Sequence, residues 1–559
     1  MYVREMKNSY RQRLSVMVPM KDGVKLSCDI RLPEGTGPFP VMLKRNPYNK
    51  AVNLTADAVT RWTSQGYVYI EQDCRGKHES EGVMEPFSQE INDGADTIEW
   101  IAKQDFCNGK VGMTGESYCG WTQLAAAAAN PQALKAITPQ VMSADNMDST
   151  ATSGGIRDTI FLWWLLLNTN RGQMADPIGD WDVFFRQLPA NRLDEIIGFE
   201  PMKAFKEALD PATAKKYRQK SEIFSGLESC DVPILLGVGW YDVFAAGSMK
   251  DAGRLIELRK KQGRDDYRVI AGPWGHSLAT STKCGDIDFG LVSMIDLPQI
   301  RNDFIAHYIK GTPLPPELEK PIYYFLMGSG EWKSADCWPP AEAKEKAFYM
   351  DALHAANSLF GDGFLSEALP SGCPTDEYNY DPLNPVPSIG GAGLWPNAPI
   401  GPMDQRPAER RDDVLCYTSA KLTRSLHLAG IPRAELFVET SAVDTDFFVR
   451  LCDVHPDGRS MLICDGGHSL RYRDGLEQEK PAIPGKCYQL KIELASTAIS
   501  ILPGHQLRVE ITSSCLPRYV RNLNSGKNPL IETEADAVIA RQKIHHSEKM
   551  PSKIILPIL

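Results

Sequence analysis

The sequence predicts an α/β core that is interrupted by a helical insertion and followed by a β-sandwich or jelly-roll domain. From residue 15 to 144, short apolar strands alternate with helical stretches, which is typical of a largely parallel sheet covered by helices. Strand patterns vanish between 145 and 229, where Trp, Leu and Met are frequent. After residue 348, Pro- and Gly-rich loops precede many short alternating segments, the pattern of a sandwich or jelly roll.

The domain boundaries follow from these changes in pattern. The first part of the core is predicted to comprise residues 1–144, and the helical segment 145–229 is predicted to be an inserted cap. Strands return in VPILLGVGWYD and YRVIAGPWGHS, so the core should be completed over 230–347. The β domain then takes 348–559. A chain of 559 residues is too long for one hydrophobic core, which agrees with such a division.

Composition excludes several classes of protein. The net charge of −10 provides no broad basic field, so nucleic acid is not an expected partner. The longest apolar run, Ile160 to Leu167, is much shorter than the roughly 20 residues that cross a bilayer. It is predicted to be a buried or pocket-lining helix, and no membrane partner is expected.

Cysteine and histidine usage indicates reduced thiols and no metal cofactor. Thirteen scattered cysteines form no C-x-x-C pair, which favours a cytoplasmic location. The polar N-terminal segment also lacks the apolar core of a secretory signal. The ten histidines show no H-x-x-x-H spacing, so neither a metal nor another cofactor is predicted.

The stretch VGMTGESYCGWTQ, Val111 to Gln123, resembles a nucleophile elbow. In such an elbow a serine lies on a strained strand-to-helix turn, and small neighbours let the strand and the helix approach closely. Here Gly115 precedes Ser117 as required, but the second glycine, Gly120, comes one residue late. Because G-x-S-x-x-G is expected by chance roughly 0.2 times in such a chain, the motif needs the support of other catalytic residues. The alternative is a serine that caps an ordinary helix.

An acid and a histidine follow in the order that α/β hydrolases require. Asp242 closes one apolar strand, and His276 follows the next. The carboxyl ends of both strands should lie at the same sheet edge as Ser117. Each residue alone is equally compatible with an ordinary loop position. The order and the strand-end placement of all three together favour a Ser-His-Asp hydrolase.

Several blocks resemble the cocaine esterase group of α/β hydrolases, which are relatives of α-amino acid ester hydrolases and X-Pro dipeptidyl peptidases. The blocks are RNPYNK, QDCRGKHESEG, GESYCGWTQ, GWYDVF and GPWGHS, and the resemblance continues through DDVLCYTS and LPGHQLRVEITSS. It implies an α/β-hydrolase core with an inserted helical cap and a C-terminal β jelly-roll domain. In that group the elbow reads G-x-S-Y-x-G, which accounts for the late glycine.

The resemblance also implies residue roles. Ser117 matches the nucleophile, Asp242 the orienting acid and His276 the general base. The hydroxyl of Tyr48 would complete the oxyanion hole together with the backbone N–H of Tyr118. Without the resemblance, Tyr48 would be interpreted as a packed aromatic residue at a strand end.

Three further residues near these blocks are interpreted as structural. Asp73 and Arg75 are expected to pair and brace the loops around the site. Cys119, beside the nucleophile, is expected to be a small packed residue, because no basic partner for a catalytic thiol can be identified.

The substrate pocket should lie where the three parts meet, because ligand sites favour domain interfaces. Candidate wall residues are Trp163, Trp164, Phe244, Leu394 and Trp395. Each is equally compatible with plain core packing. An aromatic lining would favour a bulky apolar acyl or leaving group.

The choice between ester and amide stays open at this stage. Relatives that bind a substrate ammonium use clustered carboxylates, and the cap offers Asp145, Asp148, Asp158, Asp176, Asp180 and Asp182. The first hypothesis is a serine carboxylesterase acting on a small-molecule ester. The second is an amidase or peptidase of the same fold, including β-lactam acylases. A non-catalytic binding protein is disfavoured because the whole catalytic set is present. A homo-oligomer is left open.

Overall fold

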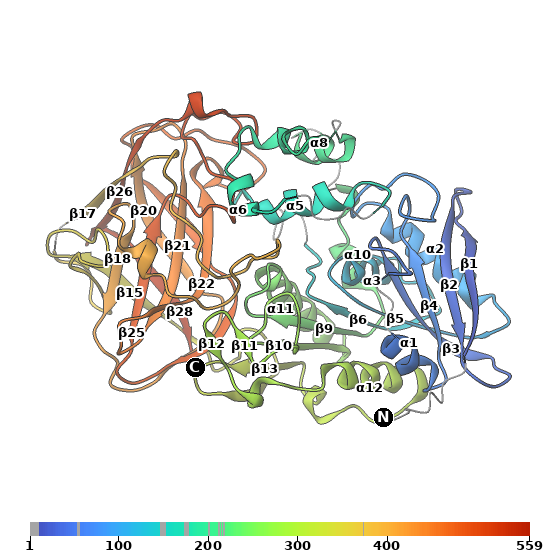
Figure 1. The fold of residues 1–559 in the computed structure, drawn as a ribbon. Helices are drawn as coiled ribbons and strands as arrows, with labels where there is room; N and C mark the ends of the chain where they lie inside the picture. The colour runs from blue at the N-terminus through green and yellow to red at the C-terminus, as the bar shows by residue number, and fades with distance from the viewer. Residues whose placement is uncertain are drawn as a thin grey trace, which may run out of the picture.

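The computed structural model describes residues 10–52, 56–145, 152–172, 178–199, 202–210, 213, 215, 219–372 and 374–559. Figure 1 shows a mixed sheet with flanking helices on the right and a β-rich domain on the left. The helices α5 (Thr159–Asn168), α6 (Trp181–Phe184) and α8 (Lys203–Leu209) of the segment 145–229 lie above the junction of these two parts. The architecture is therefore an α/β-hydrolase core with a helical insertion and a C-terminal β domain, as predicted.

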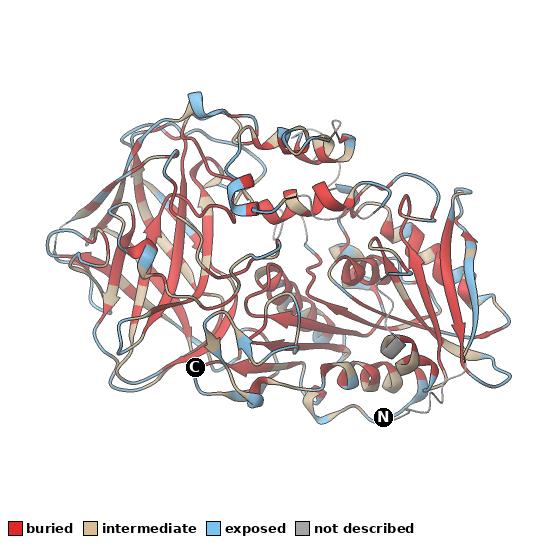
Figure 2. Ribbon diagram, in the orientation of Figure 1, coloured by how far each residue is buried: buried red, intermediate tan, exposed pale blue. Residues whose placement is uncertain are grey.

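The described residues of the core form a ten-stranded sheet. The strands in order are β1 (Arg11–Pro19), β2 (Lys25–Leu32), β4 (Val68–Asp73), β3 (Phe39–Asn46), β5 (Cys107–Glu116), β6 (Leu134–Gln140), β9 (Ile234–Gly239), β10 (Tyr267–Gly272), β13 (Ile322–Leu326) and β14 (Glu331–Ala335). Neighbours from β4 to β13 pair in parallel, and the flanking pairs are antiparallel. Strands such as β9 and β10 are buried along their whole length, as Figure 2 shows, because helices cover both faces of a parallel sheet.

Helices cover the two faces of this sheet. On one face lie α1 (Ala56–Thr63) and α12 (Leu297–Lys310), which share a buried cluster with Met42 and Ile270 of the sheet. On the other face lie α2 (Glu90–Ala102), α3 (Tyr118–Ala128), α10 (Phe224–Ser229) and α11 (Ala245–Lys261). The predicted parallel α/β layers are thus present.

The insertion is mostly helical where it is described. It contains the short pair β7 (Thr152–Ser153) and β8 (Ile156–Arg157), followed by α5 (Thr159–Asn168), α6 (Trp181–Phe184), α7 (Leu193–Ile196) and α8 (Lys203–Leu209). The apolar run Ile160 to Leu167 lies within α5 and is largely buried, as predicted. Asp158 caps this helix by accepting a 2.8 Å hydrogen bond from the backbone N–H of Ile160. Among the described residues, no helix has the length and apolar character needed to span a membrane.

The β domain begins with β15 (Lys344–Ala352) and forms a mostly antiparallel 14-stranded sheet within the described residues. Its other strands are β16 (Gly363–Ser366), β17 (Thr375–Tyr380), β18 (Leu415–Ser419), β19 (Leu426–Gly430), β20 (Arg433–Thr440), β21 (Asp446–Val454), β22 (Ser460–Ser469), β23 (Tyr488–Glu493), β24 (Thr497–Ile501), β25 (Gln506–Thr512), β26 (Ala540–Ser547), β27 (Met550–Pro551) and β28 (Lys553–Ile558). Strands such as β20 alternate between buried and half-buried residues, the pattern of a sheet with one face in the core.

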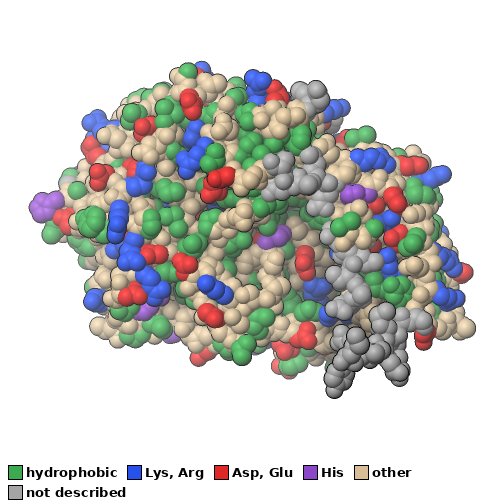
Figure 3. All heavy atoms as spheres, in the orientation of Figure 1, with side chains coloured by type: hydrophobic (Ala, Val, Ile, Leu, Met, Phe, Trp, Pro, Cys, Tyr) green, Lys and Arg blue, Asp and Glu red, His purple; other side chains and the backbone are tan. Residues whose placement is uncertain are grey.

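The two large domains are joined by backbone as well as side chains. Met327, just after β13, donates a 3.0 Å hydrogen bond to the Ala498 carbonyl in β24 and accepts a 2.8 Å bond from the Ser500 N–H. On the face shown in Figure 3, acidic and basic side chains are interspersed. This face therefore carries no extended field of one sign.

Candidate active site

Ser117 lies on a strained turn between β5 and α3, with φ 58° and ψ −128°. Such a conformation is unusual for a residue with a side chain and is typical of a nucleophile elbow. A Cβ at Gly115 would lie 2.5 Å from the Cβ of Cys119, and one at Gly120 would lie 3.0 Å from the Gln140 carbonyl oxygen of β6. Both glycines therefore let α3 approach the strands closely. Gly120, the late glycine of the motif, is the position where α3 passes the end of β6.

Asp242 and His276 meet at the ends of adjacent parallel strands. Asp242 follows β9 and His276 follows β10. The Nδ1 of His276 lies 2.7 Å from an Asp242 carboxylate oxygen. The Asp242 side chain is buried, whereas the His276 side chain is 17% exposed. With Nδ1 held by the carboxylate, Nε2 is the ring nitrogen left to exchange a proton with another group.

The Tyr48 hydroxyl lies beside the elbow. It interacts with the side chain of Ser117 and with the backbone of Tyr118. It also accepts a 3.1 Å hydrogen bond from Nε1 of Trp164 in the cap helix α5. Burial raises the pKa of Tyr48 above its ordinary value. The hydroxyl therefore stays protonated and can donate a hydrogen bond.

A buried network behind the elbow was not predicted from the sequence. The Tyr118 hydroxyl donates a 3.1 Å hydrogen bond to Glu90, which in turn forms a 2.6 Å ion pair with Arg45. The same hydroxyl accepts a 3.0 Å bond from the backbone N–H of Phe87, a residue held at φ 64°. In the sequence, only Arg45 could have indicated this network, because it places a charge at the end of the apolar strand PVMLKR. This network fixes the side chain of Tyr118 and thereby the start of α3.

Two of the predicted wall residues contact the site residues directly. Trp164 donates its indole hydrogen bond to the Tyr48 hydroxyl. Its ring stacks on that of Tyr118, with ring centroids 5.1 Å apart and an interplanar angle of 7°. The Phe244 ring lies 5.9 Å from the imidazole of His276. Both aromatic side chains therefore lie next to residues that the sequence predicts to be catalytic.

The other wall residues lie further out. The ring of Trp163 contacts that of Trp181, which packs on Phe185. The ring centroids of Phe185 and Trp395 lie 5.9 Å apart. This series of rings joins the cap helix to the loop between β17 and β18. The sequence did not single out Trp181 or Phe185. Leu394 is half-buried and packs on the main hydrophobic core, as an ordinary core residue would.

The structure corrects one expectation about the loops. Asp73 and Arg75 do not pair with each other. Asp73 accepts a 2.8 Å hydrogen bond from the backbone N–H of Lys50 and so holds the loop that carries Tyr48. Arg75 instead forms ion pairs of 2.6 Å with Asp93 and 2.7 Å with Asp22. Both residues are structural, but they brace different elements.

Cys119 is a packed residue, as predicted. Its side chain is buried, and burial raises the pKa of its thiol to about 12. A thiol with such a pKa is protonated at neutral pH and is a poor nucleophile.

Three of these cap carboxylates bind other groups. Asp158 and Asp180 cap helices α5 and α6, and Asp182 accepts a 3.0 Å hydrogen bond from Trp395. Asp145 is exposed. Asp148 and Asp176 lie outside the described residues.

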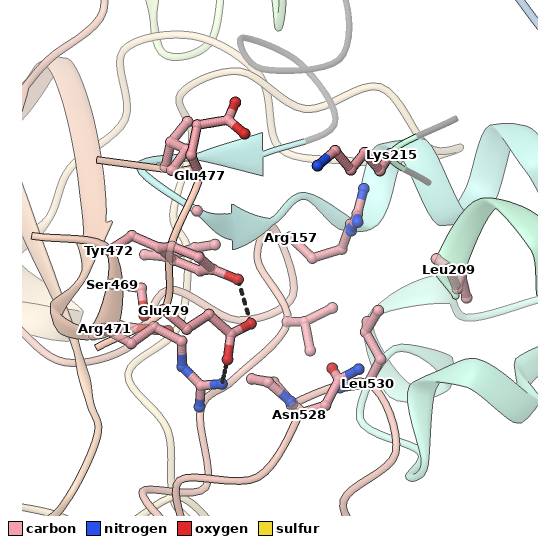
Figure 4. Close-up of a pocket in the computed structure, with 16 residues that line it drawn as sticks. Arg157, Leu209, Lys215, Ser469, Arg471, Tyr472, Glu477, Glu479, Asn528 and Leu530 are labelled. Atoms are coloured by element: carbon pink, nitrogen blue, oxygen red, sulfur yellow. Dashed lines mark hydrogen bonds and ion pairs between the residues drawn. The ribbon is translucent and has the colours of Figure 1, made fainter. Parts of the chain in front are cut away.

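Two of the cavities at the domain junctions adjoin the cap. One, of about 280 Å³, separates the cap from the β domain; in Figure 4 Glu479 joins Tyr472 and Arg471 along its wall. The other, of about 480 Å³, is lined by Asp242 and by residues of all three parts. Neither Ser117 nor His276 lines these two cavities.

Comparison with known proteins identifies the family of this chain. Residues 22–278 match the X-Pro dipeptidyl-peptidase (S15) family, and residues 317–555 match the C-terminal non-catalytic domain of X-Pro dipeptidyl-peptidase. Cocaine esterase from Rhodococcus sp. (strain MB1 Bresler) is 34% identical over 576 residues, covering 99% of each chain. This chain belongs to the S15 family of serine hydrolases.

Solved structures support the same assignment over the whole chain. An α-amino acid ester hydrolase superposes with a TM-score of 0.85 at 25% identity, covering 100% of this chain and 98% of its own. An aminopeptidase from the marine sediment archaeon Thaumarchaeota archaeon has a TM-score of 0.84 at 25% identity, with the same coverage. As an S15 protein, the chain is an enzyme that hydrolyses ester or amide bonds through a serine.

Proposed function

We propose that this S15 hydrolase cleaves carboxylic esters with a bulky or aromatic acyl group. Ser117 would act as nucleophile, His276 as general base and Asp242 as orienting acid. The observation that carries this assignment is the 2.7 Å hydrogen bond between Asp242 and Nδ1 of His276, at the sheet edge where Ser117 occupies its elbow. The alternative within the family is an amide hydrolase of the dipeptidyl-peptidase, amino acid ester hydrolase or β-lactam acylase type.

The mechanism follows from the chemistry of these groups. Ser117 attacks the ester carbonyl while Nε2 of His276 accepts the hydroxyl proton, and Asp242 stabilises the imidazolium that forms. The carbonyl oxygen becomes negative and receives hydrogen bonds from the Tyr48 hydroxyl and the Tyr118 N–H. His276 then protonates the departing alkoxide, leaving an acyl-enzyme. Water, deprotonated by His276, attacks the acyl-enzyme. As the bond to Ser117 breaks, His276 returns the proton to the Ser117 oxygen, and the acid is released.

The aromatic surroundings support the preference for an apolar acyl group. Phe244 follows the acid by two positions and packs beside the imidazole of His276. Trp164 lies over the elbow on the cap side. A free ammonium on the substrate would need a carboxylate near the nucleophile, whereas Asp158, Asp180 and Asp182 serve helix caps or Trp395. This favours an ester hydrolase over an enzyme that recognises a free amino group on its substrate.

A matched substrate panel tests the proposal. It comprises the nitrophenyl acetate, butyrate and benzoate esters, phenylglycine methyl ester, and an Ala-Pro nitroanilide, with Ser117→Ala as the blank. We expect kcat/KM for the benzoate to exceed that for the acetate by at least about 10-fold, since one or two apolar groups in a fitted pocket are worth that much. Higher kcat/KM for the free-amine substrates would contradict the ester proposal and favour the alternative.

Trp164 is expected to position Tyr48 for catalysis. Its indole N–H donates a hydrogen bond to the Tyr48 oxygen and so fixes the orientation of the phenol beside Ser117. Trp164→Phe removes this donor but keeps an aromatic ring. We expect kcat to fall about 10-fold with a smaller change in KM, because a lost neutral hydrogen bond is worth about 1 to 1.5 kcal/mol.

Trp163→Phe is the matched control. Trp163 is the neighbouring tryptophan, and its buried indole N–H has no hydrogen-bond partner among the described residues. Its kcat should stay near that of the wild type. Equal loss of kcat in both variants would show that Trp164 acts through packing and not through Tyr48.

A cytoplasmic location remains part of the proposal. It is supported by the cysteines, since each of those that the structure describes carries a free thiol.

A further inference from the structure

Two histidines and a carboxylate converge at one end of the β domain. Asp453 and His455 lie at the end of β21, and His505 immediately precedes β25. Because side chains alternate along a strand, Asp453 and His455 point to the same face. The antiparallel register pairs Val454 with Gln506, which brings His455 opposite His505. The pleat therefore gathers all three side chains on one face.

Their potential ligand atoms are close enough for a single ion. Nδ1 of His505 lies 2.8 Å from one Asp453 oxygen, and Nε2 of His455 lies 3.5 Å from the other. All three ligand atoms lie within 4.8 Å of one another, and the two imidazole rings are 4.5 Å apart. In tetrahedral zinc sites, bonds of about 2.0 to 2.2 Å separate the ligand atoms by about 3.3 to 3.5 Å. The longest separation can exceed this value by up to about 1.4 Å, so movements of less than about 1 Å in each side chain would complete such a geometry.

The charge of the cluster also suits a cation. Asp453 is buried, and its ion pairs among the described residues are with these two histidines alone. A second cluster in the same domain, Glu409 with Cys452 and Glu510, differs in this respect. There Arg508 pairs with Glu409 at 2.5 Å and Arg450 with Glu510 at 3.2 Å, so the carboxylates already have cationic partners.

The cluster faces a cavity between the β domain and the hydrolase core. This cavity, of about 230 Å³, is lined by Asp453, His455 and His505 on one side. On the other side it is lined by Tyr241, Phe289 and Phe325 of the core. It has room for a water molecule or another small ligand at a fourth coordination position. Tyr241 immediately precedes Asp242, so the cavity adjoins the strand end that carries the proposed catalytic acid.

We propose that Asp453, His455 and His505 bind one divalent transition-metal ion, with Zn²⁺ as the best match. Two imidazoles and a carboxylate are a ligand set that suits Zn²⁺ and not Mg²⁺ or Ca²⁺. The open position faces the cavity, where water completes the coordination. The ion holds the turn after β21 against the loop before β25, at the surface where the β domain meets the core. Sequence spacing did not reveal the site because His505 lies 52 residues after Asp453.

Metal binding by the full-length chain tests this proposal. The protein is treated with a chelator, dialysed against Zn²⁺ and analysed for bound metal, and Co²⁺ is titrated while its visible absorption is followed. We expect about one ion per chain and a Co²⁺ spectrum of low coordination number. His455→Ala and His505→Ala should each weaken Zn²⁺ binding at least 10-fold, since even loss of an outer partner has that effect.

His354→Ala is the matched control. His354 belongs to the same domain and also pairs with a carboxylate, Asp362 at 2.6 Å, but it is largely exposed. Its variant should bind Zn²⁺ as the wild type does. Ester hydrolysis measured on each variant reports whether it is folded, and His455→Gln and His505→Gln serve if an alanine variant is not.

Two results would overturn the proposal. Absence of stoichiometric Zn²⁺ and of a Co²⁺ spectrum in the wild type would identify the cluster as a hydrogen-bonded His-Asp-His clamp. Binding that is unchanged in folded variants of both His455 and His505 would place the metal elsewhere.

Discussion

Replacing Ser117 with alanine should lower kcat for ester hydrolysis by about 10⁵ to 10⁶-fold, the loss typical of a triad serine. The Ser117 hydroxyl interacts with Tyr48 at the elbow, and alanine at the same φ of 58° offers no nucleophile. The residual rate should come from the oxyanion donors and from substrate binding alone. Single-turnover kinetics with nitrophenyl benzoate measure the loss of rate. Thermal unfolding of the same sample measures whether the variant is as stable as the wild type. The melting temperature should not fall, because Ser117→Ala removes only a half-buried hydroxyl.

Cys119→Ala is the control for this experiment. Cys119 is the other nucleophilic side chain at the start of α3, and its thiol is buried with a pKa raised to about 12. Its alanine variant should keep most of the wild-type kcat. Abolished activity in Cys119→Ala with retained activity in Ser117→Ala would reverse the assignment and make the enzyme a thiol hydrolase.

The elbow and the two strand-end residues could be predicted because they depend on local and topological rules. A strand, a tight turn and a helix are encoded within VGMTGESYCGWTQ, and the late Gly120 has a physical reason in the approach of α3 to Gln140. The carboxyl ends of parallel strands share one edge, so the order Ser117, Asp242, His276 already indicated proximity. The hydrogen bond between Asp242 and His276 agrees with that expectation.

The surroundings of the site could not be predicted because they depend on how distant segments dock. The bond from Trp164 to Tyr48 requires the cap helix to lie over the loop after β3, which no periodicity specifies. The expected pairing of Asp73 with Arg75 was wrong because Arg75 turns toward α2 and pairs with Asp93. The convergence of His455 and His505 likewise depends on a strand register that the sequence alone did not give.

Tyr48→Phe should lower kcat by about 100 to 1000-fold and change KM much less. The phenol is the side-chain donor proposed for the oxyanion, and removing one such donor typically costs that much in rate. The ring would keep its packing, because phenylalanine differs only by the hydroxyl. The affinity for the ground state should therefore be nearly unchanged, and the loss should be confined to the transition state.

Tyr118→Phe separates this effect from a general disturbance of the elbow. Tyr118 contributes its backbone N–H to the proposed oxyanion hole, and that group survives the substitution. Its hydroxyl points away to Glu90, so the variant should lose stability more than kcat. If Tyr48→Phe keeps the wild-type kcat, the Tyr118 N–H must be joined by another donor, and Tyr48 would be only the acceptor for Trp164. A larger kcat loss in Tyr118→Phe than in Tyr48→Phe would instead mean that the geometry of the elbow, and not the phenol, limits the reaction.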